Sequence, residues 1–160
     1  MLREDIVTPV DQLIELDGST TYFLERLRNE KLNISLEHQA EQQRQNKTAI
    51  VRTVKLYFDS TEYPILYCES ELIKEHMSPL EYQQISEALL PIGKVFSLNV
   101  SQTVLKKNFY ISKGHFEGVH AQLNISVFEK VYLKRYGLWQ GPRQIARISE
   151  FFSEQTLARV

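Results

Sequence analysis

Two charged side chains, one basic and one acidic, each stand alone in a row of apolar residues. Residues 49–58 alternate as a β-strand does, so every second side chain points to the same face. Arg52 is the only charge on one otherwise apolar face of this stretch. Residues 144–152 alternate in the same way, and Glu150 is the only charge on one of their faces. A buried charge without a partner is very costly, so each residue must meet a partner of opposite charge or an equivalent ligand group.

The two charges allow different interpretations. Arg52 and Glu150 could form one buried salt bridge, or they could hold the two ends of a small polar ligand. A guanidinium donates two parallel hydrogen bonds to a planar carboxylate, and a carboxyl group can act as a general acid or base. Arg52 could also pair with another structural carboxylate, or its row could face solvent near the start of the strand.

Composition limits the classes of function that the chain can have. The 160 residues suit one domain with a real core, and 42% hydrophobic with 24% charged residues is ordinary for a globular protein. A net charge of −1 gives no electrostatic footprint for nucleic acid or an anionic membrane. The single cysteine, Cys68, excludes an internal disulfide and a multi-cysteine zinc site. Because its surroundings are apolar, we expect a buried structural thiol.

Location and partners follow from the same features. No apolar run approaches the ~18–20 residues of a membrane span, and the first residues lack the apolar core of a signal peptide. The expected location is therefore the reducing cytoplasm. We expect a small-molecule partner, no nucleic acid and no membrane, and a monomer or weak homo-oligomer.

Three helices are expected in the first half of the chain. Residues 9–16 and about 21–31 have apolar residues at helical spacing, and Ser19-Thr20-Thr21 is a cluster of N-cap residues before the second. This cluster could offer free N–H groups to a ligand or could only cap the helix. The third helix, 78–89, begins with Ser78 as cap, proline next and glutamate completing a capping box.

The remaining periodic segments predict about six strands, over residues 32–38, 49–58, 63–73, 95–111, 120–136 and 144–152. The polar segment 37–47 could extend the first strand or form a loop or mobile flap. In the turn 90–94, Gly93 permits close approach of the main chain to a ligand. The strands cluster and short loops join them. We therefore predict one α+β domain over 1–160, with an antiparallel sheet and helices covering one face.

The order of these features resembles the chorismate pyruvate-lyase family over roughly residues 13–152. Asp17-Gly-Ser-Thr-Thr-Tyr-Phe-Leu-Glu25 is similar to the segment that opens the family's first main helix. Ile50-Val-Arg-Thr-Val54 is similar to its arginine-bearing strand, and Leu90-Pro-Ile-Gly93 to its Pro-Leu/Ile-Gly turn. Ile148-Ser-Glu-Phe-Phe152 is similar to its last strand.

The resemblance implies a role for each matching residue. Arg52 would bind the substrate carboxylate, and Ile92 with Gly93 would offer backbone to the same group. Thr20 would border the ligand, where the ubiquinone-pathway enzymes carry a methionine. Glu150 would lie at the hydroxyl end of the product, so that Arg52 and Glu150 would be the catalytic pair. Lys106-Lys107 stands where those enzymes have a Thr-Arg segment. By themselves, this basic pair and the pair Lys134-Arg135 are each typical of a solvated face.

The implied activity is elimination of pyruvate from chorismate to give 4-hydroxybenzoate, with neither metal nor organic cofactor. The alternative is a non-catalytic effector-binding domain of UTRA type, related in fold and found in GntR-family regulators. Those domains usually follow a DNA-binding domain, for which we expect no room before Leu13, so the lyase is the favoured expectation. A third possibility is a structural protein in which Arg52 and Glu150 only pair.

Overall fold

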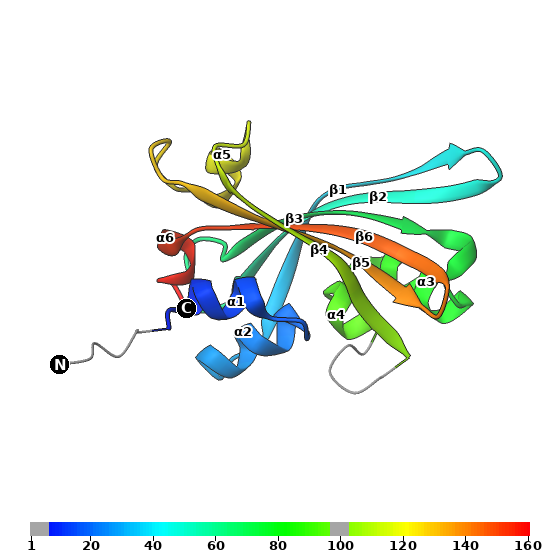
Figure 1. The fold of residues 1–160 in the computed structure, drawn as a ribbon, viewed down its shortest axis with the longest axis horizontal. Helices are drawn as coiled ribbons and strands as arrows, with labels where there is room; N and C mark the ends of the chain where they lie inside the picture. Colours follow the sequence, from blue (N-terminus) through cyan, green and yellow to red (C-terminus); the bar gives the residue numbers. More distant parts are fainter. Residues whose placement is uncertain (1–6, 97–102) are drawn as a thin grey trace.

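The computed structural model describes residues 7–96 and 103–160, and its framework is one antiparallel sheet (Figure 1). In the order in which they lie side by side, the strands are β1 (Leu32–Arg44), β2 (Lys47–Phe58), β3 (Leu66–Ile73), β6 (Arg143–Phe152), β5 (Val131–Gln140) and β4 (Val104–Gly114). The prediction of an α+β domain with a six-stranded antiparallel sheet is confirmed.

The first three strands follow the predicted pattern closely. β1 and β2 form a long hairpin whose turn places Gln45 at a φ of 55°. The segment 37–47, for which strand, loop and flap were all open, is therefore mainly an extension of β1. Along β2 every second side chain is buried, from Ile50 to Phe58, which puts Arg52 on the inner face as its alternation predicted.

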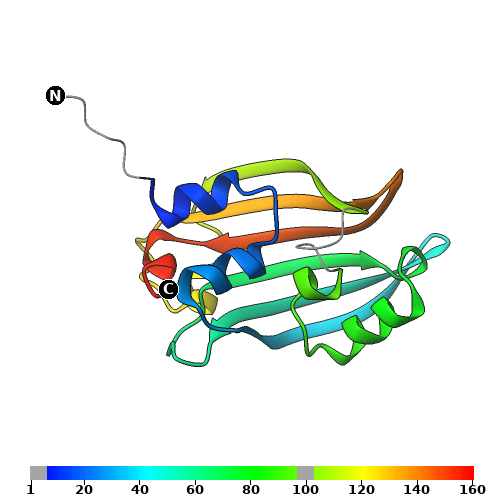
Figure 2. The same cartoon turned by 90° about the horizontal axis from the view of Figure 1, so that it is seen from below.

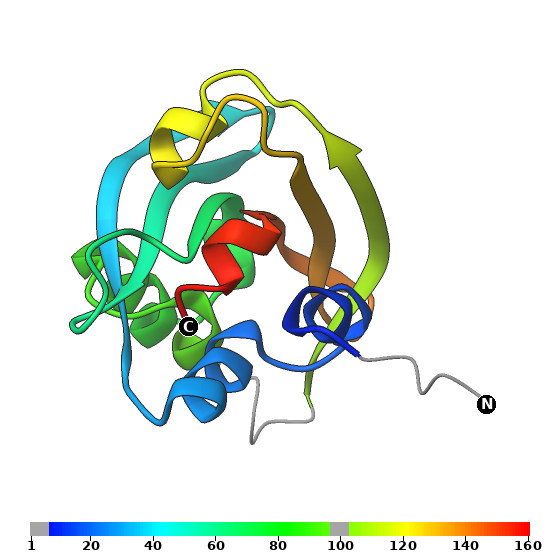
Figure 3. The ribbon, with the colours of Figure 1, turned by 90° about the vertical axis from the view of Figure 1, so that its left-hand side faces the viewer.

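Most helices cover one face of the sheet, and Figures 2 and 3 show the sheet curving around them. On or beside this face lie α1 (Pro9–Glu15), α2 (Thr20–Arg28), α3 (Pro79–Glu87), α4 (Ile92–Val95), the 3₁₀ helix η1 (Lys74–His76) and the terminal α6 (Glu154–Leu157). Capping explains where two of them begin. Ser19 caps α2, and Ser78 with Glu81 forms the predicted capping box of α3.

The strand predicted at the start of the second half is wrong in part. The strand expected over 95–111 begins only at Val104, because Ile92–Val95 is the short helix α4, and residues 97–102 lie outside the described chain. β4 continues to Gly114. A two-residue turn, in which Gly141 has a φ of 58°, closes the β5–β6 hairpin.

The strand expected over 120–136 is largely wrong, because its first part is the helix α5 (Val119–Leu123). Val119 and Leu123 are one helical turn apart, and both are buried against Tyr67 and Phe151 on the far face of the sheet. This contact outweighs the alternation of apolar residues that favoured a strand. α5 is therefore the helix that lies across the sheet from the others (Figure 1).

Two apolar clusters lie on the helix-covered face. One packs α1, α2 and α6 on β2 and β3, with Leu13, Leu24 and Phe58 fully buried. The other packs α3 and α4 on β5 and β6, with Ile85 and Ile145 fully buried. The polar residues described next lie where these clusters meet. Within residues 7–96 and 103–160, no helix is long and apolar enough to cross a membrane.

Candidate ligand-binding cavity

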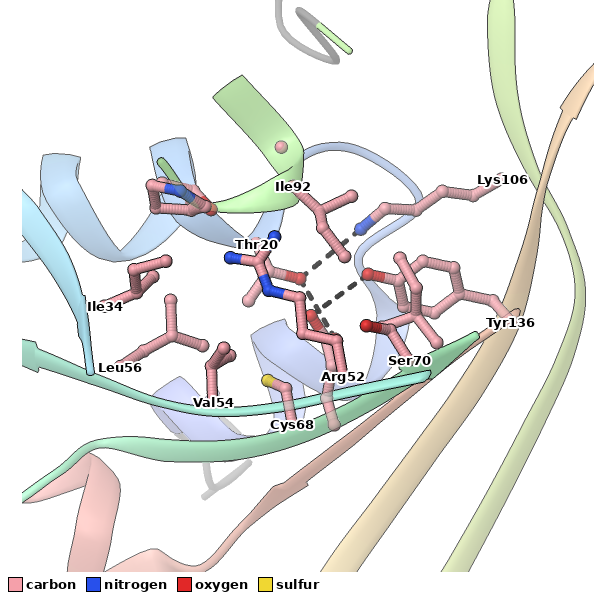
Figure 4. Close-up of a pocket in the computed structure, with 15 residues that line it drawn as sticks. Thr20, Ile34, Arg52, Val54, Leu56, Cys68, Ser70, Ile92, Lys106 and Tyr136 are labelled. Atoms are coloured by element: carbon pink, nitrogen blue, oxygen red, sulfur yellow. Dashed lines mark hydrogen bonds between the residues drawn. The ribbon is translucent and has the colours of Figure 1, made fainter. Parts of the chain in front are cut away.

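A cavity opens between the inner face of the sheet and the N-terminal ends of α2 and α4 (Figure 4). About 460 Å³ there is free of protein atoms, part of it open to solvent. Apolar side chains of both core clusters form much of the wall, and the cavity is also lined by polar and charged side chains of five strands and α2. The apolar wall residues are Ile34, Val54, Leu56, Pro91, Ile92 and Ile148.

Arg52 is the most unusual residue of the lining. Its side chain is only 1% exposed, yet only one nitrogen of its guanidinium, Nη2, has a hydrogen-bond partner, the carbonyl oxygen of Leu90 at 3.2 Å. Nε and Nη1 are buried without any partner. Burial lowers the pKa of Arg52 to about 10, which leaves the side chain charged at neutral pH. The sheet therefore holds a buried cation with unused donors.

Glu150 forms a hydrogen-bonded cluster across the cavity floor from Arg52. One carboxylate oxygen accepts from the hydroxyl of Thr20 at 3.1 Å, and the other accepts from the hydroxyl of Tyr136 at 3.1 Å. Lys106 donates to the Thr20 hydroxyl at 3.3 Å and lies 4.3 Å from the centre of the Tyr136 ring. Burial, with the nearby Glu150 carboxylate as a second cause, raises the pKa of Tyr136 well above its usual value.

Cations outnumber carboxylates around this space. Arg52 and Lys106 line the cavity, and the fully buried Lys134 lies beside Glu150 as its partner on the neighbouring strand. Burial lowers the pKa of Lys106, and it lowers the pKa of Lys134 to about 8, although Glu150 opposes both shifts. Glu150 is the one carboxylate among the described lining residues, so the site carries an excess of positive charge.

The roof of the cavity depends on close contact between two helix ends. A Cβ atom added to Gly93 at the start of α4 would lie 2.9 Å from the Ser19 hydroxyl oxygen and 3.0 Å from that of Thr21. These distances are shorter than side chains allow, so only glycine lets α4 approach α2 this closely. Gly93 therefore serves the packing of the roof, in addition to any backbone role toward a ligand.

The five residues singled out from the sequence meet in this one cavity: Thr20, Arg52, Ile92, Gly93 and Glu150. Their roles in binding stay predictions. Arg52 and Glu150 form no ion pair with each other, and no ion pair of Arg52 occurs in the described part of the chain. The interpretation in which the two residues only pair is therefore not what the geometry shows. Cys68 is buried, as expected, and lies in the cavity floor.

Sequence reasoning missed Lys106, Lys134 and Tyr136 as parts of the site. Lys134 was interpreted as a solvated residue, although it is as isolated on an apolar strand face as Arg52 is: its neighbours on that face include Tyr136 and Leu138. The same signal could therefore have found it. Lys106 gave no such signal, because it lies near the start of β4 and a bulge between Lys107 and Tyr110 breaks the alternation.

The described residues contain no group of three or more histidine, cysteine or acidic side chains that could hold a metal ion. The cavity offers donors, one carboxylate and apolar walls instead. Such a lining is suited to holding a small organic molecule by hydrogen bonds, charge and shape.

The fold is shared with solved structures of bacterial regulators. No protein-family model matches the sequence, and a comparison with curated proteins finds no match. The C-terminal domain of the histidine utilization repressor from Pseudomonas syringae is 10% identical, with a TM-score of 0.61 over 79% of this chain and 94% of that domain. The effector domain of PhnF from Mycobacterium smegmatis is 11% identical, with a TM-score of 0.63 over 86% of this chain and 90% of that one.

A third similar structure is the ligand-binding domain of a GntR-family transcriptional regulator from Bordetella bronchiseptica, 11% identical, with a TM-score of 0.57 over 78% of this chain and 83% of that one. At these identities the likeness shows the fold alone, which is that of UTRA-type effector domains. The expectation of an enzyme, a chorismate lyase, is wrong, because the similar structures are a repressor's C-terminal domain, an effector domain and the ligand-binding domain of a regulator. The matched motifs could not separate an enzyme from an effector domain, because a cavity with a buried arginine suits carboxylate binding with or without catalysis.

Proposed function

We propose that this domain binds a small organic anion in the cavity and acts as an effector-binding domain without catalysis of its own. The observation that carries the proposal is Arg52, which is 1% exposed and has two guanidinium nitrogens without partners. Burying a cation in this way costs free energy, and natural structures rarely leave such donors unused. A ligand oxyanion would supply both the missing charge and the missing acceptors.

A carboxylate fits Arg52 better than a single-atom anion does. Nη2 carries two hydrogens and gives one to Leu90, so another remains beside the hydrogen of a neighbouring, unpartnered nitrogen. Two such parallel N–H groups match the two oxygens of a carboxylate. The excess of positive charge around the cavity favours the same class of ligand.

The Glu150 cluster supports a second polar group on the ligand. Each oxygen of Glu150 accepts one hydrogen bond and keeps a further lone pair, and Lys106 has hydrogens beyond the one given to Thr20. A ligand hydroxyl can donate to Glu150 and accept from Lys106 at once. Arg52 lies on β2 and Glu150 on β6, two strands away, so their backbones are about 10 Å apart across the sheet. A small hydroxylated acid with an apolar body matches these features.

The test compares ligands that differ only in charge. We expect 4-hydroxybenzoate, used as a probe, to bind in calorimetric titrations, and the uncharged 4-hydroxybenzamide of nearly the same shape to bind at least about 30-fold more weakly. Arg52→Met should remove this preference, while Arg143→Met, an exposed arginine on β6, should keep it.

Aliphatic hydroxy acids of similar length belong in the same titrations, because the apolar walls do not require an aromatic ring. Equal affinity for matched acids and amides would contradict the proposal. So would an acid preference that survives in Arg52→Met.

A further inference from the structure

The side chain of Lys134 caps the C-terminal end of α1 from the protein interior. Its ammonium donates to the carbonyl oxygen of Leu13 at 2.7 Å and also to that of Leu16, the C-cap residue. The last carbonyls of a helix have no partner within the helix and form the negative end of its dipole. Lys134 is fully buried, so it supplies this end of α1 with a charged donor that water cannot reach. Figure 2 shows α1 lying over this side of the sheet.

The ammonium group of Lys134 interacts electrostatically with the charged groups around the cavity. Glu150 is its direct partner on β6, Lys106 acts on it from β4, and Asp17 acts on it from the segment after α1. The ring of Phe109 on β4 lies 5.4 Å away. Burial lowers the pKa of Lys134 to about 8, and Glu150 limits that shift. The cost of holding this charge under α1 therefore depends on how much negative charge the cavity contains.

We propose that Lys134 couples negative charge in the cavity to the packing of α1 on the sheet, so that a bound anionic ligand stabilises the packed position of α1. Packing of α1 takes the ammonium out of water, and a nearby anion offsets part of that cost. By thermodynamic linkage, the packed helix strengthens binding of the anion by the same factor. Only the ligand part of this inference rests on the proposed function, because Glu150 already supplies negative charge to the cavity.

A double-mutant cycle tests the coupling without any ligand. The readout is the protection of the amides of residues 10–16 against hydrogen exchange at pH 7. Glu150→Gln should lower this protection by about fivefold or more in the wild-type background. In the Lys134→Gln background, where an amide donor replaces the charge, the same change should have a much smaller effect. Lys134→Met is the second uncharged variant, should Lys134→Gln not fold.

Glu150→Gln also changes the hydrogen bonds with Thr20 and Tyr136, but this change occurs in both backgrounds and cancels in the cycle. Lys130→Gln, an exposed lysine just before β5, is the matched control and should behave like the wild type. An equal effect of Glu150→Gln in both backgrounds would overturn the inference.

A second experiment repeats the exchange measurement with a ligand, which is 4-hydroxybenzoate or whichever acid binds most tightly. At pH 7 we expect it to raise the protection of residues 10–16 in the wild type and not in Lys134→Gln. At pH 9.5, where Lys134 is mostly neutral, the gain should shrink. A gain that is the same in Lys134→Gln would also overturn the coupling. If no acid binds at all, the proposed function fails, whereas the cycle still decides whether Lys134 links the cavity to α1.

Discussion

Arg52 lies in an environment that costs the protein stability. Its guanidinium is buried and donates only one hydrogen bond, to the carbonyl oxygen of Leu90, whereas the guanidinium of Arg159 donates to the carbonyl oxygens of Pro64, Leu123 and Asn124. Arg159 therefore has the environment of a structural residue, with its donors used on the backbone of the protein itself. Arg52 has unused donors that face a cavity, which is the environment expected of a ligand-binding residue.

This contrast predicts opposite effects of the same substitution. Arg52→Met should leave the free energy of unfolding without ligand unchanged or raise it by about 1 kcal/mol, since it removes an uncompensated buried charge. Arg159→Met should lower it by about 1–3 kcal/mol, because three carbonyl oxygens lose their donor. Urea unfolding at pH 7 measures both. A loss of 3–5 kcal/mol in Arg52→Met would instead mark Arg52 as part of a structural ion pair.

Lys134 should give the protein a characteristic dependence of stability on pH. Its pKa is lowered to about 8 in the folded state from 10.5, so between these values the unfolded chain binds more protons. Stability due to Lys134 is therefore reduced below pH 8 and rises as pH increases from about 8 to 10.5, by at most about 1.4 kcal/mol per pH unit. Denaturant unfolding at several pH values should show this rise in the wild type. The difference between wild type and Lys134→Gln isolates it, and parallel curves would contradict the prediction.

At the scale of residues, strand alternation predicted one kind of cavity-lining residue well, the lone charge on an apolar face. A lone charge on an apolar strand face identified Arg52 and Glu150, because alternation fixes the face and burial of a charge demands a reason. The same rule applied to β5 would have included Lys134. Tyr136 could not be found in this way, since a tyrosine on an apolar face is ordinary core, and its role appears only through the cross-strand hydrogen bond to Glu150.

At the scale of elements, the cavity exists because α4 rests directly on the start of α2. Gly93 is the contact point, with the hydroxyl oxygens of Ser19 and Thr21 at 2.9 and 3.0 Å from where its Cβ would be. Ser19 is the N-cap of α2 and Thr21 lies in its first turn, so neither can move without disturbing Thr20 and its bond to Glu150. The roof and the polar cluster therefore form one packed unit.

Gly93→Ala should accordingly damage stability and binding together. The added methyl group forces α4 away from α2, and we expect the free energy of unfolding to fall by about 1–3 kcal/mol, as for other overpacked sites. Affinity for a bound acid should fall too, because the roof shifts. Gly114→Ala is the matched control, since a Cβ at Gly114 meets no atom within 4 Å. If the two variants unfold and bind alike, the close helix contact does not shape the cavity.

Element types were predictable where pattern and local chemistry agreed. β1, β2, β6 and the capped helix α3 follow directly from alternation and capping residues. α5 did not, because five residues between glycine-containing and polar segments are too short for a helical period to stand out, and only packing against Tyr67 and Phe151 decides their form. α4 was hidden for the same reason within a Pro-Ile-Gly sequence that reads as a turn.

At the scale of the molecule, the sheet consists of two three-stranded halves, β1–β2–β3 and β4–β5–β6, that pair through β3 and β6. Arg52 belongs to the first half, while Glu150, Tyr136 and Lys106 belong to the second. A ligand that contacts both ends of the cavity therefore bridges the halves. The fold could be predicted from sequence, but enzyme and effector domain could not be separated, because a lone buried charge on an apolar strand face suits binding as well as catalysis.

Bridging by the ligand predicts stabilisation of the whole domain and not only of the cavity. At an acid concentration 100 times the dissociation constant, the free energy of unfolding should rise by about 2.7 kcal/mol, which corresponds to a rise in Tm of about 5–10 °C for a chain of this size. Hydrogen exchange should slow in β2 and in β5 alike, because unfolding of either half releases the ligand. Arg52→Met should show neither effect at the same acid concentration, whereas Arg143→Met should show both. Slower exchange in only one half would mean that the ligand contacts that half alone, and the two-ended arrangement of Arg52 and Glu150 would then be wrong.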